Sequence, residues 1–160
     1  MKIISKEDFN KFVDALIQDK ELRVEGVKSK KEKFVFGSIE SSKELRLDYD
    51  VTILPPKKYF LPQYETMMEF DLSNPLNIKE TSNGKKLVLI GVHPYDIIAI
   101  KQMDCYFLDT DISTSYLKRR KNTIIIGSDV LKVSDRAFFG CMNTDKVENG
   151  YDLFLSPSLL

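Results

Sequence analysis

Two largely apolar runs constrain the fold of this chain more than any other feature of its sequence. Lys86–Val92 (KLVLIGV) and residues 123–126 (TIII) place apolar groups at successive positions, so a strand built from either run is apolar on both faces. Between them we predict helices at residues 96–107, with Asp96 as the N-cap, and at residues 113–120. A strand, helices and a second strand indicate a parallel βαβ unit covered on both sides.

The remaining elements follow from local periodicity. Ser5 is a predicted N-cap, and the apolar residues after it recur at helical spacing, which predicts an N-terminal amphipathic helix. Residues 22–27, 33–36 and 151–155 are short β-prone runs. Residues 44–54 alternate apolar and polar side chains and predict a half-buried strand ended by Pro55 and Pro56, and residues 71–84 predict a polar loop. The fold class is therefore α/β (α+β), with a mixed β-sheet and flanking helices.

Length and charge narrow the classes of function. The chain has 160 residues, about the size of one domain. Lys+Arg and Asp+Glu number 24 each, so no global charge attracts nucleic acid, and nucleic acid is not an expected partner. No apolar run approaches the roughly 18 residues of a membrane span. We expect a cytoplasmic protein without a membrane span.

The two cysteines predict neither a disulfide framework nor a structural metal site. Cys105 and Cys141 lie 36 positions apart and fit no CxxC or zinc-type spacing, so we expect free thiols. The sequence also contains no glycine-rich phosphate loop of the GxGxxG or Walker type. Nucleotide binding by either route is unsupported.

Ligands of open α/β sheets bind beyond the carboxyl ends of the parallel strands. Two segments have that position here: residues 93–96 after the first apolar run and residues 128–130 after the second. If the two strands are neighbours, these segments face each other beside the start of a helix. His93 is the sole histidine of the chain, and a packing role for it is the alternative to a functional one.

Four segments of the sequence resemble one protein family. They are DYDVTILPPKKYFLP at 48–62, GVHPYDIIAIKQMDCYFLD at 91–109, YLKRRKNTIIIG at 116–127 and AFFGCMNTDKVENGYDLFL at 137–155. In order and spacing they resemble the N-terminal domain of the β-type iron–sulfur subunits of archaeal sulfhydrogenases and of the related iron–sulfur subunit of anaerobic sulfite reductase. The combination of LPPKK, GVHPxD and GYDL is more specific than any single segment. The resemblance covers nearly the whole chain and implies a subunit of an electron-transfer complex.

The resemblance also implies a [4Fe–4S] cluster, which family members hold with four cysteine thiolates. Cys141 falls where the family carries serine, and Cys105 lies in a predicted helix, so neither restores the ligand set. We predict no cofactor in this chain, and we expect apolar and aromatic side chains to fill the space of the cluster. The positions that match the family's ligands are occupied by Tyr95, Val130, Ala137 and Phe139.

The resemblance extends to domain organisation and to a candidate binding surface. Family members continue into a ferredoxin-like part, so we expect residues 1–160 to form a single domain without that part. Several residues match the family without an obvious place in the core. We predict that these residues form a binding surface. The alternative is structural: the prolines among them end a strand, and the arginines interact favourably with the dipole at the end of a helix. These candidate residues are Pro55, Pro56, Lys57, Lys58, His93, Asp96, Arg119 and Arg120.

Three functions remain open from the sequence. We favour an accessory or docking subunit, or a degenerate domain, of an anaerobic oxidoreductase complex of hydrogenase or sulfite reductase type, which binds the protein subunits of that complex. The second is an active electron-transfer subunit whose cluster has unmatched ligands. The third is a small-molecule or anion-binding module in the emptied crevice between Tyr95 and Val130. An enzyme acting alone is the weakest, because no nucleophile–base pair, metal triad or paired carboxylates are evident.

Overall fold

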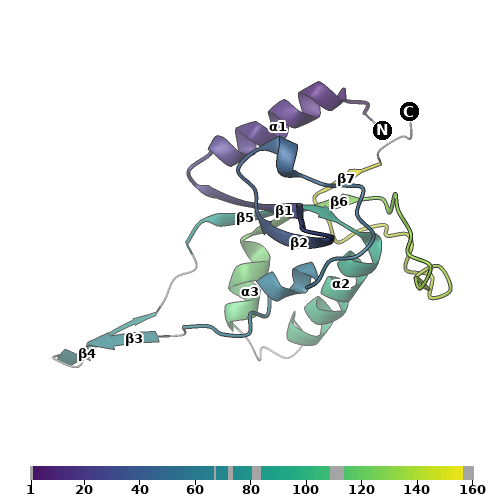
Figure 1. The fold of residues 1–160 in the computed structure, drawn as a ribbon. Helices are drawn as coiled ribbons and strands as arrows, with labels where there is room; N and C mark the ends of the chain where they lie inside the picture. Colours follow the sequence, from purple (N-terminus) through teal and green to yellow (C-terminus); the bar gives the residue numbers. More distant parts are fainter. Residues whose placement is uncertain (1, 67, 72–73, 81–83, 109–113, 157–160) are drawn as a thin grey trace.

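A computed structural model describes residues 2–66, 68–71, 74–80, 84–108 and 114–156 (Figure 1). The chain forms three α-helices, two 3₁₀ turns and seven strands within these ranges. In chain order the elements are α1 (Lys6–Gln18), β1 (Leu22–Lys30), β2 (Lys33–Ser38), η1 (Ser42–Glu44), η2 (Pro56–Tyr59), β3 (Met68–Asp71), β4 (Asn74–Glu80), β5 (Lys86–Val92), α2 (Pro94–Leu108), α3 (Thr114–Lys121), β6 (Thr123–Ser128) and β7 (Leu153–Leu155).

The main sheet has five strands in the order β2-β1-β5-β6-β7. Strands β1, β5, β6 and β7 run parallel, and β2 is antiparallel to β1. The two apolar runs are the neighbouring strands β5 and β6, joined through α2 and α3, so the predicted α/β class and parallel βαβ unit are confirmed. No helix in the described part of the chain is long and apolar enough to cross a membrane.

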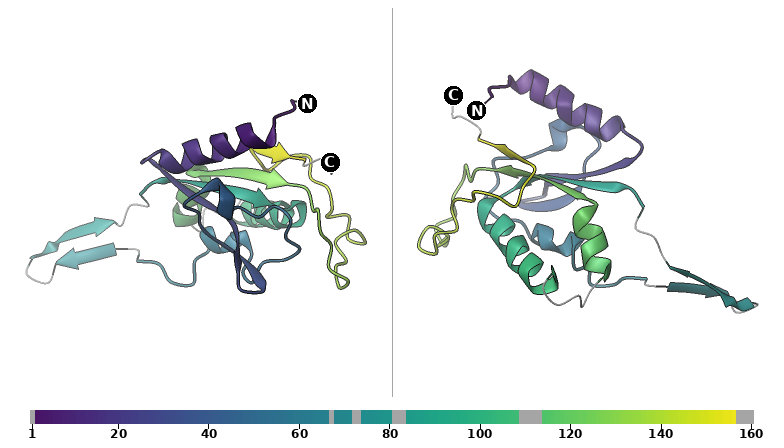
Figure 2. Two further views of the ribbon diagram at one scale, coloured as in Figure 1. Left: turned by 45° about the horizontal axis from the view of Figure 1, so that its top comes forward. Right: turned by 180° about the vertical axis from the view of Figure 1, so that it is seen from behind.

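Helices cover both faces of this sheet (Figure 2). The amphipathic helix α1 packs on one face, and its N-cap is the predicted Ser5, whose Oγ accepts from the backbone N–H of Asp8 at 3.1 Å. Val13 of α1 is buried against Val24 and Val88 of the sheet. Helices α2 and α3 and the turn η2 cover the other face. The second helix was expected from residue 113, and Ser113 lies outside the described residues.

The prediction of a strand at residues 44–54 is wrong. This segment begins in η1 and contacts the main sheet through an isolated bridge between Phe34 and Thr52 and through a hydrogen bond from the backbone N–H of Arg46 to the carbonyl of Val27 at 2.8 Å. The first apolar residues of the alternation pack on the sheet, because Leu45 and Leu47 press on strand glycines, whereas Val51 and Ile53 are 60% and 55% exposed. A Cβ built on Gly26 would lie 2.8 Å from Leu45 Cδ1, and one on Gly91 would lie 2.9 Å from Leu47 Cδ2. The period of two therefore located side chains that pack on the sheet near its start, but it established neither a strand nor a hydrogen-bond partner.

The prediction of a polar loop at residues 71–84 is also wrong. Residues 74–80 form β4, which pairs antiparallel with β3 in a separate two-stranded sheet. The register shifts between Phe70 and Asp71, so residues 75–77 fall in an irregular part of the pairing. Pro75 is tolerated there because an irregular edge needs no ladder hydrogen bond from its nitrogen. The polar and turn-forming residues of this segment thus favoured a loop prediction, whereas the chain forms a hairpin.

Candidate functional site

Helix α2 begins directly after β5, at the carboxyl edge of the parallel strands. The first residue of the helix is Pro94, whose fixed φ suits that position. The carbonyl of His93 accepts from the backbone N–H of Asp96 and of Ile97, both at 3.0 Å. The prediction of Asp96 as the N-cap is therefore wrong: Asp96 lies inside the first turn, and His93 holds the flanking position.

His93 lies in a stack of aromatic rings beneath this edge. Its imidazole is fully buried, and its centroid lies 3.9 Å from that of Tyr49, with an interplanar angle of 2°. Its Nδ1 lies 2.6 Å from the hydroxyl oxygen of Tyr95. Tyr49 donates to the carbonyl of Gly91 at 2.7 Å, which fixes the stack to the end of β5. Sequence reasoning missed Tyr49 as part of the site, although it is the aromatic side chain within the alternating segment.

The hydrogen bonds determine the protonation of His93. Tyr95 donates its hydroxyl hydrogen to the carbonyl of Asp50 at 3.0 Å, so Nδ1 of the neutral imidazole carries hydrogen and donates to Tyr95. Nε2 then carries a lone pair and has no hydrogen-bond partner among the described residues. Burial lowers the pKa of His93 to about 4, against the opposing effect of the Asp50 carboxylate. The imidazole is therefore neutral at pH 7.

Of the four positions matched to cluster ligands, Tyr95 and Phe139 join this stack of rings. The rings of Tyr95 and Phe139 are stacked, with centroids 5.5 Å apart and an interplanar angle of 26°. Val130 is half-buried after β6, and Ala137 is exposed. None of the four supplies a thiolate, and the hydroxyl of Tyr95 already bonds to His93 and Asp50. These residues do not fit a [4Fe–4S] cluster, whose irons need soft anionic ligands.

The cysteines lie outside this arrangement of rings. Both are free and exposed, Cys105 on α2 and Cys141 in the connection between β6 and β7. Within the described ranges, no group of three or more His, Cys, Asp or Glu side chains is placed to hold a metal ion. The free thiols expected from the sequence are confirmed.

Asp96 is a half-buried carboxyl in the first turn of α2. Burial raises its pKa to about 7, and the positive charge of Lys57 acts in the opposite direction. Its side chain makes no hydrogen bond to any other described residue. A carboxyl with such a pKa is partly protonated near neutral pH, which is unusual for an aspartate.

The segment LPPKK forms the turn η2 against α2. Pro55 is the N-cap and Pro56 is buried at the first position, where a missing N–H costs nothing. Lys58 donates to the carbonyl of Phe36 at 2.7 Å and lies over the ring of Tyr59 at 4.9 Å, and burial lowers its pKa. Lys57 is exposed. Of the four residues, Lys57 is the one whose charge reaches Asp96.

The two arginines of the candidate surface hold α3 in place. Arg119 donates through Nε to the carbonyl of Phe60 at 2.9 Å and pairs with Glu65. Arg120 pairs with Asp104 of α2 at 2.9 Å. Both guanidiniums therefore bind neighbouring elements, and neither contacts His93. The structure brings together His93, Tyr95 and Phe139, places Lys57 beside Asp96, and leaves the arginines apart from them.

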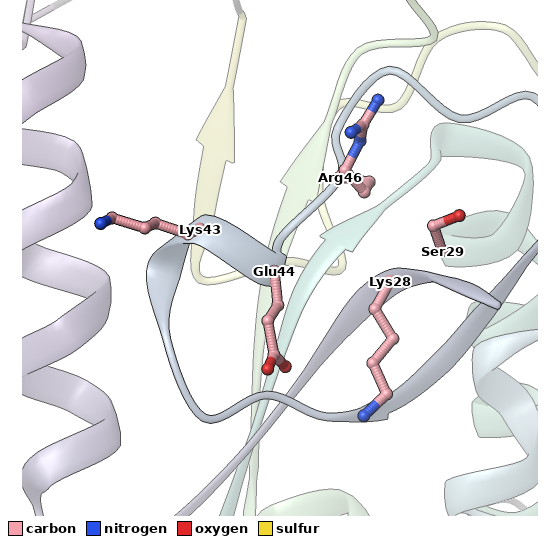
Figure 3. Close-up of a pocket in the computed structure, with 5 residues that line it drawn as sticks. All are labelled: Lys28, Ser29, Lys43, Glu44 and Arg46. Carbon is pink, nitrogen blue, oxygen red and sulfur yellow. The ribbon is translucent and has the colours of Figure 1, made fainter.

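A pocket of about 420 Å³ is lined by residues of β1, of η1 and of the segment after η1, and none of the stacked rings lines it (Figure 3). Figure 3 shows its three cationic side chains pointing in different directions, with no common point at which an anion could bind all of them. Two are already engaged: Lys28 donates to the carbonyl of Ser38 at 2.7 Å, and Arg46 forms a bidentate pair with Asp48 at 2.8 and 2.9 Å. The pocket is therefore not a candidate anion site.

The chain is therefore an α/β domain with a mostly parallel sheet. The buried imidazole of His93 and the aromatic rings around it lie at the carboxyl ends of the parallel strands. The chain is similar to sulfhydrogenase 2 subunit beta of Pyrococcus furiosus, with 36% identity over 120 residues. The match covers 75% of this chain and 35% of the relative, so the chain spans about a third of that protein. The chain is therefore related to the sulfhydrogenase beta subunits. No family model matches the sequence, and no solved structure matches it either.

Proposed function

We propose that this chain is an accessory or docking component of an oxidoreductase electron-transfer complex, of hydrogenase or sulfite reductase type, and that it holds no iron–sulfur cluster. The relationship to a sulfhydrogenase beta subunit supports the class of complex. The expected partners are the protein subunits of such a complex. The chain's contribution is then a binding surface and not a redox centre.

The observation that carries this proposal is the stacking of Tyr95 on Phe139. These two of the four matched positions are in ring contact, so the side chains pack together where thiolates would have to converge. The hydroxyl of Tyr95 is also fixed between His93 and Asp50. Emptying a cluster pocket without such filling would leave a cavity that costs several kcal/mol. The same stacking argues against a ligand-binding module in this crevice.

Iron analysis of the anaerobically purified protein tests the proposal. We expect a colourless protein without iron or acid-labile sulfide, and recovery of redox-complex subunits in an anaerobic pull-down. A matched variant carries Tyr95→Cys, Val130→Cys, Ala137→Cys and Phe139→Cys, and after reconstitution we expect it to bind iron. Stoichiometric iron and sulfide in the wild-type protein would contradict the absence of a cluster. A pull-down that recovers no redox subunit would contradict the docking role.

A further inference from the structure

Four lysines gather at the edge of the main sheet where the parallel strands begin. The backbone N–H of Lys86 donates to the carbonyl of Glu21 at 3.1 Å, and that of Leu87 donates to the carbonyl of Asn122 at 2.9 Å. The starts of β1, β5 and β6 therefore lie side by side, at the usual strand spacing of about 5 Å. The lysines at or just before these strand starts form a lysine patch, which consists of Lys20, Lys85, Lys86 and Lys121.

Ion pairs do not neutralise the lysine patch within the described part of the chain. All four side chains are exposed, and none of them pairs with a carboxylate of a described residue. Asp19 and Glu21 are the carboxylates in the turn that carries Lys20, and the Asp19 carboxylate accepts from the backbone N–H of Glu21 at 2.9 Å. The lysines of the patch therefore outnumber the carboxylates of that turn, and the patch is a local surplus of positive charge.

This surplus occurs in a chain without net charge. Lys+Arg and Asp+Glu number 24 each over the whole sequence, so the excess at this edge comes from the fold, which brings three separate segments together. Neighbouring segments lie about 5 Å apart, which is within the screening length of roughly 8 Å at physiological salt, so the positive charges repel one another. Binding of a negatively charged surface relieves that repulsion.

The residues around the lysine patch favour an acidic protein surface over nucleic acid or a membrane. They include no aromatic side chain on which a base could stack. Their apolar residues, Leu22 and Leu87, are half-buried, so no exposed apolar side chain among them can insert into a membrane. Arg119 and Arg120, whose planar guanidinium groups suit phosphate, are already paired with carboxylates. The segments compared are residues 19–22, 84–87 and 118–123.

We propose that the lysine patch is the docking surface for an acidic patch on a protein partner, a subunit of the complex to which this chain belongs. The inference rests on the docking role proposed above and adds the location of the surface and the chemistry of the partner. Carboxylates of the partner face the four ammonium groups, so association is fast at low salt and slows as salt screens the charges. The patch lies at the amino ends of the parallel strands, whereas His93 lies at their carboxyl ends.

Charge reversal in the lysine patch tests the proposal. A patch variant carries Lys85→Glu and Lys121→Glu, and a control variant carries Lys30→Glu and Lys33→Glu, which change the net charge equally at two exposed, directly opposed positions of the β1–β2 hairpin. Binding to the subunits that the wild-type pull-down recovers is measured by biolayer interferometry, and circular dichroism establishes that each variant is folded. We expect the patch variant to bind about tenfold more weakly at about 50 mM salt, with a smaller difference at about 500 mM, and the control variant to stay within about twofold of the wild type. Equal losses in both variants, or a patch variant that binds like the wild type, overturn the proposal.

A second measurement separates the lysine patch from the docking role on which it rests. Poly-L-glutamate is the acidic polypeptide probe, and duplex DNA and vesicles of phosphatidylserine and phosphatidylcholine are polyanions of the other classes. We expect the wild type to bind poly-L-glutamate more tightly than DNA or vesicles, and the patch variant to lose about tenfold in affinity for it. If this result accompanies a pull-down without redox subunits, the docking role fails and the acidic-protein site stands. Poly-L-glutamate binding that does not depend on the patch, or tighter binding of DNA or vesicles, overturns the site itself.

Discussion

Replacement of Asp96 by asparagine is expected to reveal a pH dependence of stability that the wild-type protein conceals. Two groups at the start of α2 have pKa values displaced by burial in opposite ways. The pKa of His93 falls from an ordinary value of 6.5 to about 4, and that of Asp96 rises from 3.8 to about 7. Their effects on the free energy of unfolding therefore have opposite signs.

The signs follow from which state binds the proton. Between pH 4 and 6.5 the unfolded chain is protonated at His93 and the folded chain is not, so the free energy of unfolding rises with pH by about 3 kcal/mol. Between pH 4 and 7 the folded chain holds a proton on Asp96 that the unfolded chain has lost, so the free energy of unfolding falls by about 4 kcal/mol. The two contributions largely cancel in the wild type.

Asp96→Asn removes the second contribution and leaves the first. Urea denaturation between pH 4 and 7.5 should show the variant losing about 3 kcal/mol as the pH falls from 6.5 to 4, while the wild type changes by less than half of that. Asp135→Asn, which alters an exposed carboxylate, should follow the wild type. His93 is the sole histidine, so its imidazole signal in NMR is unambiguous. Titration of that signal near pH 6.5, or a variant as flat as the wild type, would refute the reasoning.

Two further substitutions test the packing beneath the site. Gly91→Ala should destabilise the protein by about 1–3 kcal/mol, because Gly91 has a φ of +84° and its Cβ would lie 2.9 Å from Leu47 Cδ2, whereas Gly84→Ala meets open space and should leave the urea midpoint unchanged. Tyr95→Phe removes the acceptor of His93 Nδ1 and the donor to Asp50, so we expect a loss of about 1–3 kcal/mol and a changed imidazole tautomer in NMR, with exposed Tyr64→Phe as the control. An unchanged urea midpoint for either test variant would contradict these contacts.

The sequence predicted the elements in which apolar residues recur at a spacing typical of a buried strand or of an amphipathic helix. The runs that became β5 and β6 are apolar at successive positions because both faces of these strands are covered, and α1 repeats at helical spacing because one face packs on the sheet. The cap at Ser5 needs only neighbouring residues to form. Such signals survive in the sequence because the interactions behind them are local or fill one continuous face.

Pairing and hydrogen bonding were decided by the tertiary structure. The alternation in residues 44–54 corresponds to burial for Leu45 and Leu47, which contact glycines of β1 and β5, but not for its later apolar residues, which are exposed. The start of α2 was misplaced because Asp96 is a common N-cap residue, whereas Pro94 and the carbonyl of His93 determine the first turn. Competing local signals of similar strength need the fold to choose between them.

For the candidate site, too, some features were determined by the sequence and others only by the tertiary structure. The sequence by itself determined that four matched positions lack thiolates, since that depends on residue identity alone. Only the tertiary structure decided that Tyr95 stacks on Phe139 and that Tyr49 stacks on His93, because these ring pairs join segments more than 40 residues apart along the chain. The neutral state of His93 also follows from burial, which no local pattern encodes. The chemical type of each residue is known from the sequence. The contacts between distant side chains and the burial that shifts a pKa arise only when the chain is folded.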